Sequence, residues 1–420
     1  MSLKLLSLLG LVAFVLLAWA LSLDHKRFPW RTVLTGLGLQ FIFGVLILTT
    51  EPGKAAFTFA NDAISRLIGF SDEGAKMVFG PLANGDLLAE KWGANNAFIF
   101  VVTVTATIVL VSAVSSLLYH YGVLQLVVRG VAWVMRRVMR TSGSESLAAA
   151  ANIFMGQTEA PLVIKPYLPR MTRSELMALM TGGMATIAGG VLAVYVKFGE
   201  AAGRMDMAGH LLTASVMSAP ASLMIAKVML PETEPSETAA GASAKIERES
   251  VNGLDAMCRG ASEGMTLSLN VMAMLIAFVA VVAMVNHLLS SGLGLVGLAT
   301  DKPLQTALGW LNWPFAFLMG VPVRDCELVG QILGERIVLN EFVGYLSLSQ
   351  QAETLDTRSF TIATYALCGF ANFSSIAIQI GGIGSLAPTR RADLAKLGLR
   401  AMAGGLLACY LTATVVGILL

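Results

Sequence analysis

Charged residues are scarce in this chain. Of its 420 residues only 13% are charged, while 55% are hydrophobic, and soluble domains carry about 25% charged residues. A soluble globular protein is therefore excluded, and the composition is typical of a chain whose solvent is the bilayer. The formal net charge of +2 is too small to indicate a nucleic-acid partner.

Cysteine, histidine and nucleotide-binding motifs are also scarce. The four cysteines are scattered, with no CxxC pair among them: Cys258, Cys326, Cys368 and Cys409. The four histidines are equally dispersed, so the sequence predicts neither a zinc site nor a disulfide framework. The chain contains no Walker A sequence, so nothing in it indicates transport driven by ATP.

Long apolar runs are what the chain has in abundance. A run of about 20 residues is enough for a helix to cross the hydrocarbon core. Eight runs of roughly this length are predicted to do so: residues 2–23, 32–50, 97–119, 174–197, 210–229, 265–289, 360–386 and 401–420. Residues 53–95, in which apolar positions recur at helical spacing among charged ones, are predicted to form helices at the membrane interface.

The placement of basic residues sets the orientation of these spans. Lys26, Arg27 and Arg31 follow the first run, which by the positive-inside bias places the first loop in the cytoplasm and the N-terminus outside. The alternative is that the first run is a cleaved signal peptide, since Ala18-Trp19-Ala20 resembles a cleavage site. The sequence thus predicts a multi-pass membrane protein.

Two segments are predicted to enter and leave the membrane on the same side. Roughly 25 residues separate Arg140 from Lys165, too few for two crossings of ~20 residues each. Because both flanks are basic, this segment is predicted to be a re-entrant hairpin on the cytoplasmic side. Residues 306–320 and 328–348 are two short apolar stretches after an outward span, and they are predicted to form a second hairpin, entered from outside.

Two spans are predicted to be broken near the middle of the membrane. Gly182-Gly183 and Gly189-Gly190 flank residues 185–188, and a stretch rich in small and polar residues interrupts the run at 369–375. Glycine weakens a helix by about 1 kcal/mol per residue. The order hairpin, broken span, span therefore occurs twice with opposite orientation, which is typical of secondary transporters. The Pro/Glu/Ser-rich residues 231–250 are predicted to be a mobile cytoplasmic loop.

Polar side chains gather at the predicted hairpins and breaks. The first repeat carries Asn152, Gln157, Thr158, Glu159 and Thr186, and the second carries Asn340, Glu341, Asn372, Ser374 and Ser375. A single Asn or Thr in a span commonly serves helix packing, but a carboxylate costs at least ~2.5 kcal/mol to insert, so the two acids are predicted to be functional. A set without Lys or Arg suits a neutral solute with several hydroxyl or amide groups.

Two coupling ions are compatible with these residues. Opened backbone at the first hairpin and at Thr186-Ile187, with the side chains of Asn152 and Thr186, would give the oxygen ligands of a sodium ion. A proton carried by Glu159 or Glu341 is the alternative. A membrane-embedded enzyme that uses these two acids, or a passive channel, is the rival class of protein. Neither needs an inverted repeat with broken helices, so we predict a transporter and not an enzyme.

Three motifs give the chain a resemblance to a known family. They are Ala151-Asn152-Ile153-Phe154 with Gly156-Gln157-Thr158-Glu159-Ala160-Pro161, then Asn340-Glu341-Phe342-Val343, and Cys368-Gly369-Phe370-Ala371-Asn372-Phe373-Ser374-Ser375-Ile376. In this combination and order the chain resembles the concentrative nucleoside transporters over essentially its whole length, and most closely the bacterial sodium-coupled members.

The resemblance implies a fold, a mechanism and a location. The fold would be all-α, with eight transmembrane helices and two re-entrant hairpins in an inverted repeat, and transport would be of the elevator type. Residues 1–140 and 231–303 would form a scaffold, with the linker in the second part, while residues 141–230 and 304–420 would be the two halves of a moving transport domain. The likeness further implies a homotrimer in the cell inner membrane that imports nucleosides such as uridine together with sodium.

The resemblance also implies roles for individual residues. The nucleobase would meet Gly156, Gln157, Thr158, Glu159 and Val191. The ribose would be held by Glu341, Asn372 and Ser375, with Phe370 beside the ligand. Sodium would be bound by the side chains of Asn152 and Thr186 and by the main-chain oxygens of Met155 and Ile187. Two positions depart from the expected pattern, since Met155 stands where Val is expected and Thr186 where Ser is expected.

Overall fold

Helices account for every regular element in the part of the chain that the structure describes. The structure is a computed structural model that describes residues 2–93, 99–239, 241–242, 250–294 and 302–420. Within these residues, seven helices or joined helix pairs are long and apolar enough to cross a membrane. They are α1 (Leu3–Ala20), α2 (Trp30–Thr49), α5 (Phe100–His120), α9 with α10 (Arg173–Ala185 and Gly189–Ala201), α11 (Met207–Met229), α12 (Gly253–Gly294) and α18 (Arg391–Leu419). The eighth predicted span, 360–386, is present as two helices, α16 (Thr357–Leu367) and α17 (Phe373–Leu386).

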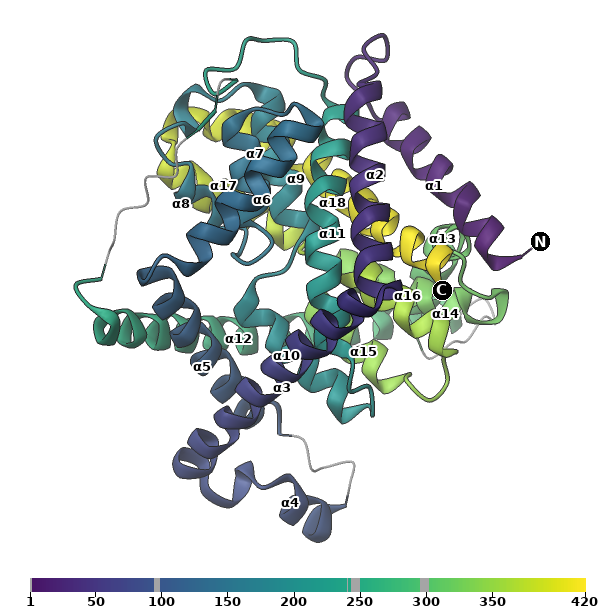
Figure 1. Cartoon of the computed structure of the whole chain (residues 1–420). Coiled ribbons are helices and arrows are strands. Elements are labelled where there is room, and N and C mark those ends of the chain that lie inside the picture. The colour runs from purple at the N-terminus through teal and green to yellow at the C-terminus, as the bar shows by residue number, and fades with distance from the viewer. Residues whose placement is uncertain (1, 94–98, 240, 243–249, 295–301) are drawn as a thin grey trace.

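Further helices lie between the second and third spans and after the third. α3 (Glu51–Phe79) and α4 (Gly85–Trp92) cover the stretch that is predicted to be interfacial, and α3 runs obliquely in the lower part of Figure 1. α6 (Val123–Met139) buries one face, with residues 128, 132, 135 and 139 at helical spacing. The sequence analysis predicts no helix of its own for these residues, so α6 is an addition to the expected fold.

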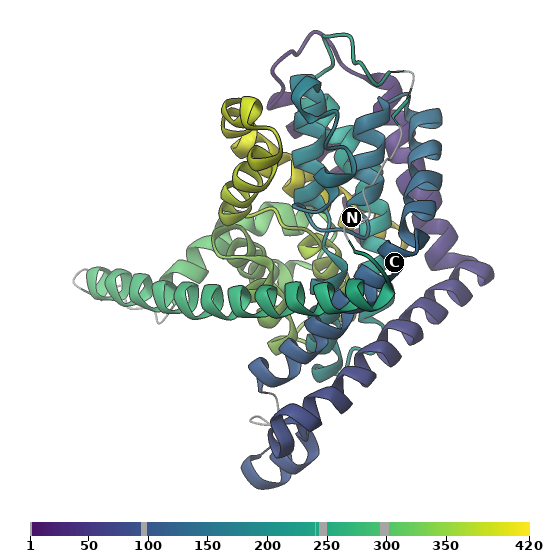
Figure 2. The ribbon, with the colours of Figure 1, turned by 90° about the vertical axis from the view of Figure 1, so that its left-hand side faces the viewer.

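The longest helix, α12, has 42 residues, whereas the sequence predicts a span over 265–289. Its first part packs on α5 through two glycines. A Cβ at Gly260 would lie 2.5 Å from the carbonyl oxygen of Ser112, and one at Gly264 would lie 2.9 Å from the Cα of Val109. Small residues four apart allow two backbones to approach this closely. The rest of α12 projects away from the bundle (Figures 1 and 2).

Each repeat begins with a helical hairpin whose turn lies inside the protein. Hairpin 1 consists of α7 (Gly143–Ala151) and the short α8 (Ala160–Val163), joined by a tip at residues 152–159. Hairpin 2 consists of α14 (Val323–Val338) and α15 (Glu341–Gln350). The buried side chain of Asn340 begins α15 by accepting a hydrogen bond from the Val343 N–H at 3.0 Å, as a helix N-cap does.

The turn of hairpin 2 differs from its predicted place. The sequence predicts arms at 306–320 and 328–348, but the second of these stretches is itself divided at residues 339–340. α13 (Pro303–Leu318) is an additional helix that packs along α14, since a Cβ at Gly330 would lie 2.5 Å from the carbonyl oxygen of Gly309. Apolar content alone does not locate a sharp turn, and here the N-capping asparagine does.

The two broken helices meet at the centre of the molecule. α9 and α10 are separated by residues 186–188, and α16 and α17 by residues 368–372, as the interruptions of both spans predict. A Cβ at Gly369 would lie only 2.6 Å from the carbonyl oxygen of Met184, so the two breaks touch. α11 and α18 pack beside them and complete the two repeats (Figure 1).

The prediction that residues 231–250 form a mobile loop does not hold for their first part. Residues 231–239 lie against the base of hairpin 1, where Thr238 is buried and its carbonyl oxygen accepts a hydrogen bond from the Gly143 N–H at 2.8 Å. Residues 240 and 243–249 lie outside the described residues. Composition misses this docking because it does not show which partners polar side chains will find.

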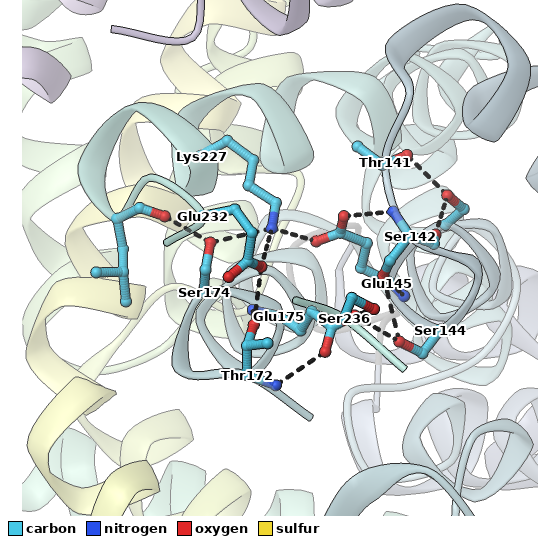
Figure 3. A network of polar contacts seen from close by, with 12 residues as sticks. Thr141, Ser142, Ser144, Glu145, Thr172, Ser174, Glu175, Lys227, Glu232 and Ser236 are labelled. Atoms are coloured by element: carbon cyan, nitrogen blue, oxygen red, sulfur yellow. Dashed lines mark hydrogen bonds and ion pairs between the residues drawn. The ribbon is translucent and has the colours of Figure 1, made fainter. Parts of the chain in front are cut away.

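Ionic and hydroxyl contacts hold the docked linker in place (Figure 3). The buried Lys227 ammonium lies 2.7 Å from the carboxylate of Glu145 on α7 and 3.2 Å from that of Glu232 in the linker. The Ser236 hydroxyl donates a hydrogen bond to Glu175 at the start of α9. The linker, hairpin 1, α9 and α11 are therefore joined at one end of the first repeat.

Candidate functional site

Both hairpin turns lie close to the helix breaks, and the local sequence explains how the polar residues are placed there. Asn372 is the N-cap of α17. Its Oδ1 accepts hydrogen bonds from the Ser375 N–H at 2.9 Å and from the Ser374 hydroxyl at 2.7 Å. The spacing of Asn372 and Ser375 therefore restarts the helix directly after the break.

Glu341 is buried and is held by two neutral donors. It is the first residue of α15 and is only 3% exposed. Its Oε2 accepts a hydrogen bond from Asn372 Nδ2 at 2.8 Å, and its Oε1 accepts one from the Tyr195 hydroxyl at 3.2 Å. The N-terminus of α15 provides a favourable helix dipole for this carboxylate. Because Tyr195 lies on α10, Glu341 joins the two repeats.

Gln157 joins the repeats from hairpin 1. Its Nε2 donates to the Ser375 hydroxyl oxygen at 3.1 Å, and its Oε1 accepts a hydrogen bond from Gln379 Nε2 at 3.1 Å. All three residues are buried. Since Asn372 links Ser375 to Glu341, a continuous chain of hydrogen bonds runs from Glu341 through Asn372, Ser375 and Gln157 to Gln379. We call these five residues the polar chain.

Two residues in or beside the polar chain are missing from the sequence-based site. Gln379 lies one helical turn after Ser375, and this spacing of polar side chains in an apolar helix is a signal that could have revealed it. It also donates a hydrogen bond to the Met180 carbonyl oxygen at 3.0 Å. Tyr195 gives no such signal, because an aromatic residue in an apolar span resembles an ordinary core residue.

Thr158 and Glu159 do not share the burial of the polar chain. Both side chains are exposed, and the Glu159 carboxylate accepts a hydrogen bond from the Gly156 N–H at 3.3 Å. Of the two acids that the sequence predicts to be functional, only Glu341 is therefore buried. The reason is local, since the Glu159 carboxylate bonds the backbone of its own hairpin tip and no residue of the second repeat.

The other predicted substrate residues are buried beside the polar chain. Gly156 lies against the break between α9 and α10, because a Cβ there would come within 3.2 Å of the Ala188 side chain. Val191 is buried in the first turn of α10, one turn before Tyr195. Phe370 lies in the break between α16 and α17, where its carbonyl oxygen accepts a hydrogen bond from the Asn372 N–H at 2.9 Å.

Asn152 is a buried amide whose hydrogen-bonding groups are unsatisfied. It ends α7 and is 1% exposed, and neither its Oδ1 nor its Nδ2 has a hydrogen-bond partner in the described part of the chain. Its Nδ2 lies 3.1 Å from where a Cβ on Gly182 would be, and the Thr186 hydroxyl donates to the Gly182 carbonyl oxygen at 3.0 Å. Buried polar groups without partners are rare and require an explanation.

The rest of the predicted ion site lies at the same contact. The Gly189 N–H donates a hydrogen bond to the Phe154 carbonyl oxygen at 3.3 Å, so the tip of hairpin 1 rests on the break between α9 and α10. Met155, next to Phe154, and Ile187, within the break, are both buried. The structure therefore brings all four residues of the predicted sodium site to one place.

A helical membrane fold with two buried hairpin turns, two broken helices and a polar chain between inverted repeats is that of a secondary transporter. Three family models match this chain. The N-terminal model of the Na+ dependent nucleoside transporters matches residues 9–82, the nucleoside recognition model matches residues 101–202, and the C-terminal Na+ dependent nucleoside transporter model matches residues 210–417.

Relatives match along nearly the whole chain. It is 42% identical over 411 residues to the uncharacterized transporter YutK of Bacillus subtilis, with 98% of each chain covered. It is 40% identical over 432 residues to sodium/nucleoside cotransporter 2 of Rattus norvegicus, with 99% of this chain and 63% of that protein covered. For solute carrier family 28 member 3 of Mus musculus the identity is 41%, and the chain spans 58% of that protein.

Solved structures share the fold. CNTnw in an inward-facing substrate-bound state matches with a TM-score of 0.91 and 38% identity, covering 99% of this chain and 97% of the other. A CNTnw variant in an intermediate state matches with a TM-score of 0.92 and 38% identity, covering 99% of both chains. The chain belongs to the concentrative nucleoside transporter family. It is a multi-pass membrane transporter and not an enzyme, which confirms the prediction from sequence.

Proposed function

We propose that this protein is a symporter that imports nucleosides such as uridine together with sodium across the cell inner membrane. The observation that carries this proposal is the polar chain from Glu341 to Gln379, which crosses the contact between the repeats. It consists of amides and a hydroxyl with a single carboxylate, and among the described residues no Lys or Arg side chain donates a hydrogen bond to it. A neutral ligand with several hydroxyl and amide groups matches such a set.

The nucleoside would bind along this chain. Its ribose hydroxyls would donate to Glu341 and bond Asn372 and Ser375, with Phe370 packed beside the ligand, and its base would meet Gln157. Gly156 and Val191 would line the base from the first repeat, and the exposed Thr158 and Glu159 would reach it from the open side, the acid through water. Because the side chains already bond one another, binding would exchange partners and leave no buried group unsatisfied.

The sodium ion would bind where hairpin 1 rests on the break between α9 and α10. The unsatisfied Asn152 carbonyl oxygen, the Thr186 hydroxyl and the main-chain oxygens of Met155 and Ile187 form a set of neutral oxygen ligands. Gln157 is two residues from Met155, so an ion that orders the hairpin tip also orders a base-binding group. By linkage, the nucleoside would then strengthen ion binding to the same extent. A proton on buried Glu341 is the alternative coupling ion.

Movement and assembly complete the proposal. Residues 141–230 and 304–420 would move as a transport domain against a scaffold of residues 1–140 and 231–303, in an elevator-like motion. Only 11% of the most apolar 18-residue window of α12 is buried within one chain, so a homotrimer and lipid would cover this face. Light scattering of the detergent-solubilised protein, with the detergent mass subtracted, should give the mass of three chains.

Uptake of radiolabelled uridine into proteoliposomes tests the coupling. We expect accumulation above equilibrium with an inward sodium gradient and none with a proton gradient alone. Equal accumulation driven by protons without sodium would favour a proton carried by Glu159 or Glu341 and contradict the sodium site at Asn152 and Thr186.

Replacement of one carboxylate tests the substrate site. Glu341→Gln preserves side-chain size but removes the charge that accepts hydrogen bonds from Asn372 and Tyr195, each worth about 1.5–3 kcal/mol for a charged acceptor. We expect uridine uptake to be nearly abolished while the trimer mass is retained. Glu353→Gln, at an exposed position after the same hairpin, is the matched control and should transport normally. Normal uptake and affinity in Glu341→Gln would remove this residue from the ribose site.

A further inference from the structure

Arg336 is a completely buried cation in the second repeat. It lies on α14 two residues before the last residue of the helix, Val338, and is 0% exposed. Its Nη1 donates to the carbonyl oxygen of Ala366 at 3.1 Å, and its Nη2 donates to that of Gly369 at 3.3 Å. These acceptors belong to the last turn of α16 and to the break that follows it. A helix C-terminus presents unpaired carbonyls with partial negative charge, and the guanidinium compensates that charge.

The first repeat builds a similar place without a fixed cation. There α9 ends at Ala185 against the end of α7, as α16 ends against α14 in the second repeat. The residue at the end of α7 is Asn152, whose amide is unsatisfied. Residues 141–201 contain no buried Lys or Arg. Among the described residues, the carbonyl groups at the end of α9 therefore have no basic side chain beside them, whereas those at the end of α16 have Arg336.

The thiol of Cys409 lies between the Arg336 guanidinium and the end of α9. The Cys409 sulfur on α18 accepts a hydrogen bond from Arg336 Nη2 at 3.3 Å. The same thiol lies 3.2 Å from the carbonyl oxygen of Cys368 and 3.7 Å from that of Ala185, the residue before Thr186. The Arg336 guanidinium of the second repeat and the unsatisfied Asn152 amide of the first thus lie on either side of the contact between the two breaks.

We propose that Arg336 is a built-in cation that takes, in the second repeat, the place that a transported sodium ion takes in the first. Two inverted repeats offer two helix breaks whose carbonyls require positive charge. The Arg336 side chain permanently supplies this charge at the break of the second repeat. Only the break of the first repeat is then left to bind sodium, so a single sodium ion accompanies each nucleoside. This inference rests on the proposed sodium site at Asn152 and Thr186. It goes further by giving the number of sodium ions transported with each nucleoside and by naming Arg336 as the residue that determines this number.

The ratio of sodium to nucleoside entering proteoliposomes tests this inference. Radioactive sodium and tritiated uridine are counted together at zero membrane potential. For the unmodified protein we expect one sodium ion per uridine and a hyperbolic dependence of uptake on sodium concentration. Arg336→Lys retains the charge and should retain this ratio. Arg336→Gln removes the charge and should either take up two sodium ions per uridine, with a sigmoidal sodium dependence, or fold as a trimer without transporting.

Several results would overturn the inference. A ratio of two in the unmodified protein would do so directly, and this measurement decides the matter even if Arg336→Gln fails to fold. Normal uptake at a ratio of one in Arg336→Gln, or equal impairment of the Lys and Gln variants in intact trimers, would also overturn it. Uridine uptake by the unmodified protein that ignores sodium would instead contradict the proposed function, so the two failures are distinguishable.

Discussion

At the residue scale, Tyr195 and Tyr345 show how adjacent side chains of one type serve different parts of the protein. Their rings are stacked with centroids 4.2 Å apart, and both residues are completely buried at 0% and 1% exposure. The Tyr195 hydroxyl donates to Glu341, whereas the Tyr345 hydroxyl donates to the Thr364 carbonyl oxygen at 2.8 Å. Tyr195 is thus a positioning residue for the proposed ribose-binding carboxylate, and Tyr345 supports the packing of α15 on α16.

The same substitution at both positions separates these roles. Tyr195→Phe removes one hydrogen bond to a charged group, worth about 1.5–3 kcal/mol, so the half-saturating uridine concentration should rise by roughly ten- to hundredfold. Tyr345→Phe should lower the thermal stability of the purified protein and leave that concentration unchanged. Uptake kinetics and melting curves measure the two effects. An equal loss of affinity in both variants would contradict a specific role for Tyr195.

Sequence patterns locate polar residues in apolar runs but not the direction in which they point. Gln157, Asn372 and Ser375 are found because polar side chains are conspicuous there, and the structure brings them together. Glu159 is equally conspicuous, yet its side chain is exposed, because the path of the hairpin tip decides burial. Arg336 was assigned no role from sequence, since its carbonyl partners come from a helix that lies 30 residues further along the chain.

At the scale of elements, the contact between the two helix breaks is the feature on which the site depends. The C-terminal ends of α9 and α16 approach each other so closely that no side chain fits at Gly369, where a Cβ would lie 2.6 Å from the Met184 carbonyl oxygen. This backbone contact sets the distance between Thr186 in one break and Asn372 in the other. The proposed ion and nucleoside sites are therefore built on one rigid junction.

Gly369→Ala should disrupt this junction. The added methyl group meets backbone that cannot rotate away, and such overpacking costs about 1–3 kcal/mol. We expect uridine uptake to fall at least tenfold and the melting temperature to decrease. Gly381→Ala on α17 is the control, because a Cβ there meets nothing within 4 Å, and its effect should stay within ~0.5 kcal/mol. Unchanged uptake in Gly369→Ala would contradict the claim that the site depends on the close contact between the two helix breaks.

Element boundaries follow from sequence where backbone chemistry marks them. Glycine pairs around residues 185–188 and the N-capping Asn372 mark the two breaks, and both lie where the sequence predicts. The turn of hairpin 2 is marked by the N-capping Asn340, which lies inside a stretch predicted to be a single arm, so hydropathy places the turn incorrectly. α6 is overlooked because its arginines obscure an amphipathic pattern.

At the scale of the whole molecule, the linker between the repeats is part of the folded structure. Lys227 on α11 is 8% exposed as a side chain and lies between Glu145 of hairpin 1, at 2% exposure, and Glu232 of the linker. A buried charge that loses its partner is strongly destabilising. This cluster therefore fixes the path by which the chain leaves the first repeat for the scaffold.

Lys227→Met should release the linker. It leaves two carboxylates without their cation, and breaking a buried pair costs about 3–5 kcal/mol. We expect a lower melting temperature and faster cleavage by protease within residues 231–239. Lys54→Met is the control, since its contact with Glu51 is exposed on both sides and surface pairs contribute little. Equal protection of the linker in both variants would contradict its docking through Lys227.

The order of spans, hairpins and helix breaks could be predicted because apolar runs and helix-breaking residues mark them along the chain. The direction of each crossing, which basic residues indicate, stays a prediction. The docking of the linker could not, because it depends on contacts between residues far apart in sequence, such as Ser144 and Thr238. Sequence patterns thus locate the elements, whereas contacts between distant residues become visible only in the folded structure.

The burial of Cys409 between the two breaks has a practical consequence. Cys326 and Cys368 are buried as well, and only Cys258 on α12 is exposed. A maleimide dye added to the unmodified protein should therefore label a single position, Cys258 on α12. Slower incorporation of a second dye would show that water and reagent reach one of the buried cysteines. The rate of this second labelling would therefore measure how often the protein interior opens.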